Sequence, residues 1–266
     1  MGQARNRRQS VGECIYCGSI ENLSDEHIIP YALDGNLVIK RASCAACARI
    51  TSQIEMRLLR GHWWPYRRQL RLQSRTFSAQ PNQFSATLKR ADGSDLPIRV
   101  SADEYPCVII LDLDPPSILS GTHRRDRPCA ARAGLKWLAP IPTTVLSGGI
   151  AIQVGPNDRV EFPVNLDATD FVQFLAKIAL GYAVSRRGLN ALREIFVRDI
   201  ILGNGNGALT YVGGDASATA TNTLPAHGLH GLAERVRGDL LSVYIQLFRT
   251  AGSPMPIYEV VVGRLR

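Results

Sequence analysis

The sequence predicts an α+β protein, with a small cysteine-rich module at residues 11–62 followed by a larger α+β domain at residues 76–266. A length of 266 residues is sufficient for one large domain or two ordinary ones. Two Cys-x-x-Cys pairs lie near the N-terminus. After them, segments rich in β-branched and aromatic residues, which are typical of strands, are interspersed with segments of helical periodicity.

The four paired cysteines predict a metal site in the first module. Cys14 and Cys17 form one Cys-x-x-Cys pair, and Cys44 and Cys47 form the other. Where thiols are kept reduced, such pairs bind metal more often than they form disulfides. Zinc held by four thiolates is tetrahedral, and each pair supplies two ligands from one tight turn. We therefore expect a structural Zn²⁺, with free thiols or redox pairs as the alternative interpretation.

A helix is predicted to close the module, over "CAACARITSQIEMRLLR". Apolar residues recur every four positions from Ile50 to Leu58 and give this helix one apolar side. Pro65, in the following "HWWPYRRQLR", is expected to end the helix. We expect Trp63 and Trp64 to pack in the core rather than to stack on a nucleobase.

In the larger domain, turn signals separate the expected strands. An Asp-Gly pair at residues 92–93 predicts a hairpin between "FSATLKR" and "LPIRVS". The segment "GPND" predicts a second hairpin between "VLSGGIAIQV" and "VEFPVNL". The run "CVIILDLD" is predicted as a strand that a Pro-Pro pair stops. Cys107 in that run and Cys129 are interpreted as small buried apolar residues.

The clearest helix of the chain is "DATDFVQFLAKIALGYAVSRRG", with Asp167 as its N-cap and Gly188 as its C-terminal stop. A further helical segment is predicted in "LNALREIFVRDIIL". Strands are predicted in "LTYVGG", "LLSVYIQLF" and "IYEVVVG". His227 and His230 in "HGLH" have a spacing compatible with a metal, but no third ligand accompanies them, so we expect surface loop histidines.

Composition and charge restrict the class of protein and its partners. Hydrophobic residues at 45% and charged residues at 20% are globular values, and no apolar run approaches the roughly 18 residues that span a bilayer. The basic N-terminus leads into no apolar segment, so we expect a soluble, cytoplasmic protein that binds no membrane. The net charge is +8, and residues 1–75 hold twelve Arg or Lys against six Asp or Glu. This excess predicts attraction to phosphates, with a solvated basic face as the alternative.

Four motifs of the module occur in a recognisable order: "CIYCG", "DEHIIP", "DGN" and "SCAAC", followed by the helix. In this order the segment 11–60 resembles the HNH endonuclease family. The resemblance implies a ββα-metal fold in which a hairpin and a helix hold a catalytic divalent cation such as Mg²⁺ or Mn²⁺, braced by a four-cysteine zinc knuckle. By position, it implies His27 as the general base, Glu26 as a ligand of the catalytic metal, and Asn36 as the residue that orients the histidine. The implied activity is hydrolysis of phosphodiester bonds, with DNA as the partner.

Elementary chemistry agrees with these roles. Phosphodiester hydrolysis needs an activated water on one side of phosphorus and neutralised charge at the departing oxygen on the other. A neutral imidazole is a suitable base, and a hard cation stabilises the developing charge. In a regular strand, His27 and Glu26 point to opposite faces, so a bulge or a strand end is needed for both to reach one phosphate.

Some positions depart from the family's pattern. Ala48 stands where many members have Asn or His as a second metal ligand, and Thr51 or Glu55 would have to replace it directly or through water. Asp34-Gly35 stands where Gly-Gly is usual. These departures leave a second function open, in which the module is a non-catalytic zinc knuckle that binds nucleic acid or another protein.

Overall fold

The computed structural model describes residues 10–61, 63–72, 82–102, 107–119, 132–137, 144–162, 167–205, 207–215, 224–249 and 255–266. These residues form helices and several antiparallel sheets, so the predicted α+β class is confirmed. Cys129 and the side chain of Cys107 lie outside what is described, and their burial stays a prediction. No helix among these residues is both long enough and apolar enough to cross a membrane.

The N-terminal module is a two-stranded hairpin followed by a helix. Its elements, in chain order, are β1 (Leu23–His27), the 3-10 helix η1 (Tyr31–Leu33), β2 (Val38–Cys44), α1 (Ala45–Arg60) and α2 (Trp64–Gln69). Strand β1 pairs antiparallel with β2, and α1 begins directly where β2 ends. The helix predicted here is confirmed. Pro65 lies in the first turn of α2, where a missing N–H costs nothing, rather than at the end of α1.

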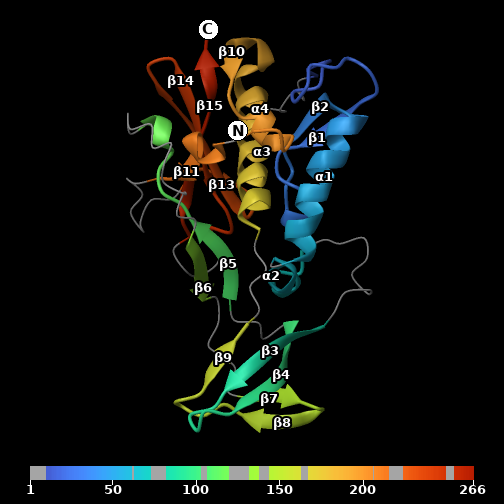
Figure 1. Ribbon diagram of the computed structural model, residues 1–266. Helices are drawn as coiled ribbons and strands as arrows, with labels where there is room; N and C mark the ends of the chain where they lie inside the picture. Colours follow the sequence, from blue (N-terminus) through green and yellow to red (C-terminus); the bar gives the residue numbers. More distant parts are fainter. Residues whose placement is uncertain are drawn as a thin grey trace, which may run out of the picture.

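A long central helix, α3 (Ala168–Arg187), lies between the module and the C-terminal part of the chain. The Asp167 carboxylate accepts a hydrogen bond from the Thr169 N–H at 2.7 Å, and Gly188, with φ at 80°, follows the last turn, so both predicted ends are confirmed. Residues 170–184 are all buried. Figure 1 shows the reason, because α3 has the blue module on one side and the red C-terminal sheet on the other.

The C-terminal sheet is antiparallel throughout and packs against α3. Its strands are β10 (Leu192–Ile195), β11 (Val212–Gly214), β12 (Ala226–His227), β13 (His230–Arg237), β14 (Leu240–Gln246) and β15 (Ile257–Leu265). The order is β10-β15-β14-β13-β12, and β11 also pairs with β15. The three strands predicted here are confirmed as β11, β14 and β15.

The helix predicted after Gly188 is mostly wrong. The segment holds the 3-10 helix η5 (Leu189–Ala191), then β10, and only a short helix α4 (Arg198–Ile201), with η6 (Ala208–Thr210) after it. Strand β10 pairs with the end of β15. This pairing in the sheet outweighs the local helical preference of the segment.

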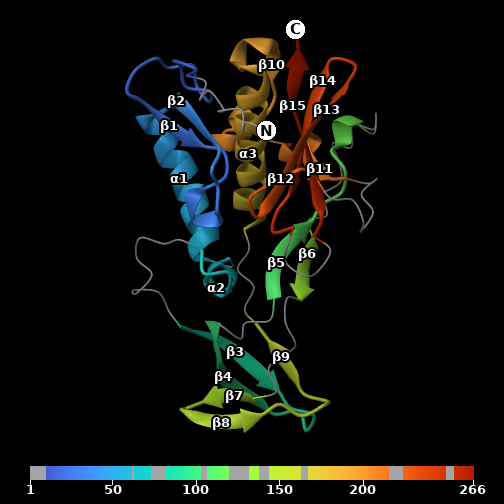
Figure 2. The ribbon, with the colours of Figure 1, turned by 180° about the vertical axis from the view of Figure 1, so that it is seen from behind.

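A second sheet of five strands has a small core of its own. Its strands are β3 (Gln83–Lys89), β4 (Asp95–Ser101), β7 (Thr144–Ser147), β8 (Ile150–Gln153) and β9 (Arg159–Glu161), in the order β8-β7-β4-β3-β9. The core consists of Ala86, Leu88, Ile98, Val100 and Val145. Figures 1 and 2 show this sheet at one end of the molecule, beyond the hairpin of β5 (Cys107–Asp112) and β6 (Arg132–Trp137).

The turns of this second sheet agree with the sequence at one hairpin and differ at the other. The hairpin at residues 92–93 joins β3 and β4, with Gly93 at φ 88°, as predicted. The second hairpin turns at Gly148 and Gly149, both with positive φ, and joins β7 to β8. The prediction of a hairpin at "GPND" is wrong, because β9, which follows it, pairs with β3 instead of β8. The strand β5, followed by the 3-10 helix η4 (Ser117–Leu119), is confirmed.

One hydrophobic core joins the module to the C-terminal sheet. A single cluster of buried residues extends from Cys14 through α3 to Val262. Trp63 is fully buried in it and makes edge contacts with Phe171, Phe174 and Phe248 at ring distances of 5.2 to 5.9 Å, so its predicted core role is confirmed. The predicted boundary between residues 62 and 76 lies partly outside the described residues and stays a prediction.

Candidate metal centre and the neighbouring carboxylate cluster

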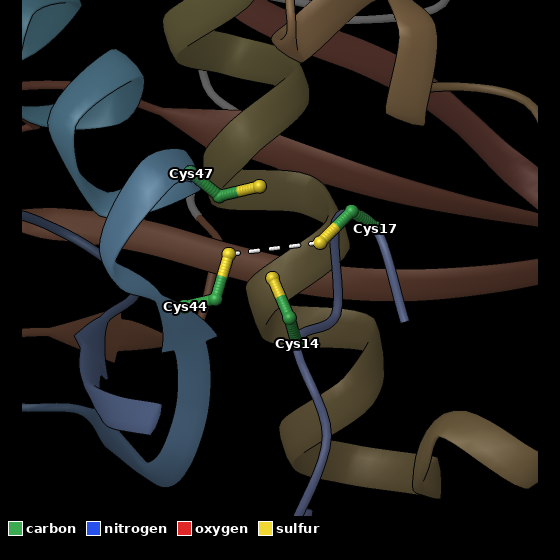
Figure 3. A group of neighbouring side chains, drawn as sticks. All are labelled: Cys14, Cys17, Cys44 and Cys47. Carbon is green, nitrogen blue, oxygen red and sulfur yellow. Dashed lines mark hydrogen bonds between the residues drawn. The ribbon is translucent and has the colours of Figure 1, made fainter. Parts of the chain in front are cut away.

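The four paired cysteines converge on one point. Cys14 and Cys17 lie on the loop before β1, Cys44 ends β2, and Cys47 lies in the first turn of α1. Their sulfur atoms all lie within 4.8 Å of one another, and Figure 3 shows the four side chains pointing toward a common centre. Three of the four residues are buried. The cluster is therefore positioned to bind a metal ion, and a set of four thiolates is consistent with a structural zinc.

Backbone hydrogen bonds hold the first cysteine pair in place. The Cys14 N–H donates to Ser19 O at 2.7 Å, and the Gly18 N–H donates to Cys14 O at 2.8 Å, which closes a tight turn. Gly18 has φ at 80°, a conformation that favours glycine. The Ile15 N–H donates to Ala42 O at 2.9 Å and so ties this loop to β2. The loop and the hairpin therefore form one unit around the thiols.

The thiols differ in acidity before any metal binds. The backbone N–H of Cys47 lowers the pKa of Cys44 to about 7, because Cys44 is the N-cap of α1 and its thiolate faces the helix N-terminus. Burial raises the pKa of Cys14 and of Cys47. Metal binding has to displace the protons of those two thiols, so acid pH opposes it.

His27 lies at the end of β1. The register of the hairpin shifts between Ser24 and Glu26, whereas Glu26 and His27 pair in regular register with Ile39 and Val38. The irregularity therefore does not fall between Glu26 and His27, and only the end of β1 at His27 remains as a way to bring both side chains to one site. The side chain of His27 is half-buried, and its Nδ1 is buried without a hydrogen-bond partner among the described residues. Asn36 is exposed in the loop before β2 and does not bond to this atom. Its orienting role stays a prediction.

Glu26 is buried, and its partner is a lysine from the central helix. The Lys177 ammonium lies 3.0 Å from Glu26 Oε1 and 2.7 Å from Glu55 Oε1, and only 2% of the lysine side chain is exposed. The same ammonium donates to the carbonyl oxygen of His27 and to that of Ile28, the latter at 3.3 Å. We call Glu26, Glu55 and Lys177 the carboxylate cluster.

The two negative charges of this cluster stabilise the protonated form of Lys177. Burial alone would lower the pKa of Lys177, but the negative charges of Glu55 and Glu26 outweigh it and raise that pKa, so the ammonium keeps its proton. Burial also raises the pKa of Tyr16 well above its ordinary value, and the charges of Glu26 and Glu55 act in the same direction. The phenol therefore stays neutral beside the carboxylates.

The residues around Glu26 do not fit the catalytic divalent cation that the family resemblance implies. Ala48 offers no ligand atom. Thr51 is buried, and its hydroxyl donates to Ala48 O at 3.3 Å. Glu55, the other proposed substitute, pairs with Lys177. The cysteine cluster thus fits a metal, whereas the carboxylates already hold a cation.

Some of the basic residues predicted to attract phosphates have structural partners instead. Both oxygens of Asp170 accept hydrogen bonds from Arg57, which ties α1 to α3. Arg67 is buried and donates to Ala32 O and Leu59 O. Among the described residues up to 72, the exposed arginines are Arg41, Arg49, Arg57, Arg60 and Arg71.

Sequence reasoning missed two residues that join the C-terminal part to the module. Lys177 had a signal, since it is the one charged residue between Asp170 and Arg186 in an otherwise apolar helix. His230 was expected at the surface, but it is fully buried in β13. Its Nε2 lies 2.8 Å from Leu33 O, its Nδ1 accepts from Phe248 N–H at 3.3 Å, and burial lowers its pKa to about 4.

A scan against protein-family models and searches of the curated proteins and of the solved structures found no match for this chain. The resemblance of residues 11–60 to HNH endonucleases accordingly rests on the quoted motifs alone, and the roles it implies are proposals.

Proposed function

We propose that this chain is a zinc-supported endonuclease of the HNH type, which hydrolyses DNA phosphodiester bonds with His27 as the general base. The observation that carries the proposal is the position of His27. It ends the first strand of a hairpin that leads directly into α1, and the cysteine cluster lies where β2 and α1 meet. The half-buried imidazole has a buried nitrogen with no partner among the described residues.

The mechanism uses the imidazole on a water molecule. His27 accepts a proton from water as the water oxygen attacks phosphorus. The bond to the 3′ oxygen breaks and that oxygen takes a proton from solvent, which leaves a 3′-hydroxyl and a 5′-phosphate end as in the HNH family. General-base assistance of this kind contributes on the order of 100- to 10,000-fold to the rate. A divalent cation, where an HNH enzyme binds one, neutralises charge on the leaving oxygen. Because the residues around Glu26 do not fit such a cation, we draw no step through it.

The zinc explains why a cysteine cluster accompanies the histidine. A two-stranded hairpin is marginally stable by itself and cannot hold a catalytic group in one position. Zinc bound by Cys14, Cys17, Cys44 and Cys47 would fix the loop before β1, the end of β2 and the start of α1 together. The metal thereby supplies rigidity, and His27 supplies the chemistry.

The test is plasmid nicking by the zinc-loaded chain and by His27→Ala. The variant should cut at least about 100-fold more slowly, while its zinc content and its DNA affinity stay near those of the native chain. Asn36→Ala serves as the companion variant, because it removes the proposed orienting residue without touching the imidazole. If the native chain nicks plasmid no faster than His27→Ala at full zinc occupancy, the nuclease proposal fails.

A second candidate function is a zinc knuckle that binds nucleic acid without cutting it. Two observations favour it: Ala48 provides no side-chain ligand, and Lys177 pairs with Glu26, the acid that the resemblance assigns to the catalytic metal, and with Glu55, its possible substitute ligand. A binder predicts equal DNA affinity for the native chain and His27→Ala, with no product from either. The same gel that measures nicking separates the two functions.

A further inference from the structure

The carboxylate cluster satisfies all the hydrogen-bonding capacity of its ammonium group. An ammonium has three N–H donors, and four acceptors surround that of Lys177: two carboxylate oxygens and two main-chain carbonyls. The lysine is almost completely buried. It therefore has no donor left for a phosphate or for water, and its partners are fixed within the protein.

A divalent ion and this ammonium would compete for the same oxygens. An ion bound to Glu26 Oε1 or Glu55 Oε1 would lie within a few ångströms of the Lys177 nitrogen, which is 3.0 and 2.7 Å from those atoms. Like charges at about 4 Å repel strongly in a partly buried site. At the position where the family pattern has Asn or His, Ala48 offers no side-chain ligand in compensation.

Close packing holds α3, which carries the lysine, against the module. Gly181 lies one turn after Lys177 on the same side of the helix, and a Cβ there would lie 3.3 Å from Ile28 Cγ1. This close approach places α3 directly against the residue that follows His27. Near the start of α3, Asp170 forms a two-point salt bridge with Arg57 of α1. The cation is thus positioned by the same contacts that join α3 to the module.

We propose that the Lys177 ammonium is the resident cation of the Glu26–Glu55 site. It takes the place of the catalytic divalent cation that the family resemblance implies. The described part of the module then binds its divalent ion at the cysteines and none at the carboxylates. Lys177 acts as a positioning residue, because it holds Glu26 and the carbonyl of His27 without contacting a substrate. The inference takes from the proposed function only the identity of Glu26 as the cation site and does not depend on hydrolysis.

The test is Mn²⁺ binding to the zinc-loaded chain, measured by electron paramagnetic resonance in the absence of DNA. The native chain should show no Mn²⁺ binding that Glu26→Gln abolishes. Lys177→Met, which keeps an unbranched side chain that is one atom shorter and removes its charge, should bind Mn²⁺ tighter by on the order of tenfold or more. That gain should disappear in Lys177→Met/Glu26→Gln, and Lys177→Arg should show none.

Lys89 provides a matched control on the surface. It also lies between two carboxylates, those of Asp95 and Glu161, but its side chain is 38% exposed. Lys89→Met should therefore create no comparable Mn²⁺ site, since water screens the exposed acids.

Two results would overturn the inference. One is Mn²⁺ binding by the native chain that Glu26→Gln removes, and this measurement stands even if Lys177→Met does not fold. The other is a folded Lys177→Met that gains no Mn²⁺ affinity. Failure of the nuclease proposal gives a different result, namely absent nicking, and leaves these binding measurements unaffected.

Discussion

The cysteine cluster and the two acids of the carboxylate cluster lie in the same module but obtain their cation in different ways. The cysteine cluster consists of four residues from one short segment, all with sulfur atoms within 4.8 Å, and it needs an ion from solution. The carboxylate cluster has two acids from the module, and its cation is an ammonium that α3 supplies from more than a hundred residues away. The first cluster is complete within the module, whereas the second exists only after α3 has docked.

This difference separates two kinds of stability. A metal in the first cluster stabilises the loop, β2 and α1 locally. The ion pairs of the second cluster join the module to α3, and a buried pair of this kind contributes little net stability but is costly to break from one side. Removing each cation in turn should therefore produce effects that differ in size and in location.

The largest effect is expected at the cysteines. Cys44→Ser removes one thiolate, and since zinc binding in small zinc modules is worth about 10 to 16 kcal/mol and is largely folding free energy, the module should unfold. Loss of zinc by elemental analysis together with loss of amide protection in residues 11–60 would show this. Ala46→Ser, at an exposed position of the same helical turn, is the control. A Cys44→Ser chain that keeps a full equivalent of zinc would break the comparison.

The next effect is expected at the lysine. Lys177→Met leaves the buried Glu26 and the half-buried Glu55 without their cation, so the free energy of unfolding should fall by about 3 to 5 kcal/mol while zinc content is unchanged. Chemical denaturation of the zinc-loaded chain measures it. Lys89→Met, at the exposed pair, should change the midpoint little. Equal shifts for the two lysines would mean that the carboxylate cluster has no special role.

A smaller effect is expected from a neutral contact between the module and β13. His230 makes this contact. An unfolded histidine binds a proton near pH 6.5, whereas burial lowers the pKa of His230 to about 4. Between these values the unfolded state holds more protons, so this contribution to stability is fully present above about pH 6.5 and is lost as pH falls toward 4. The loss should be about 3 kcal/mol at most.

His230→Gln sharpens that measurement. Glutamine keeps one donor for Leu33 O and one acceptor for the Phe248 N–H but does not titrate. The difference in unfolding free energy between the native chain and this variant, followed from pH 7 to pH 4, isolates the histidine from the acids. A difference that stays constant across this range would contradict the buried, neutral state of His230.

Features that depend on neighbouring residues could be predicted from the sequence, and features that depend on contacts between distant segments could not. The cysteine pairs and the helices at residues 45–60 and 168–187 depend on local spacing, caps and periodicity, and these features were predictable. The partner of Glu26 was not, because nothing local says which of the chain's cations will face a given acid. His230 was misplaced for the same reason, since its burial results from the packing of β13 on the module.

Two errors in secondary structure have one physical cause. Residues 192–195 have a helical sequence pattern but pair with β15, and β9 pairs with β3 across the sheet rather than with the preceding strand. In both cases the partner is distant in sequence. Strand pairing of that kind overrides local preference, and a single sequence does not reveal it.

Crystals of the zinc-loaded chain soaked in Mn²⁺, with anomalous scattering recorded at the zinc and manganese edges, would locate both ions. We expect a zinc peak among Cys14, Cys17, Cys44 and Cys47, no manganese peak at Glu26 or Glu55, and the Lys177 nitrogen between those carboxylates. A manganese peak bonded to Glu26, with Lys177 displaced, would contradict this expectation.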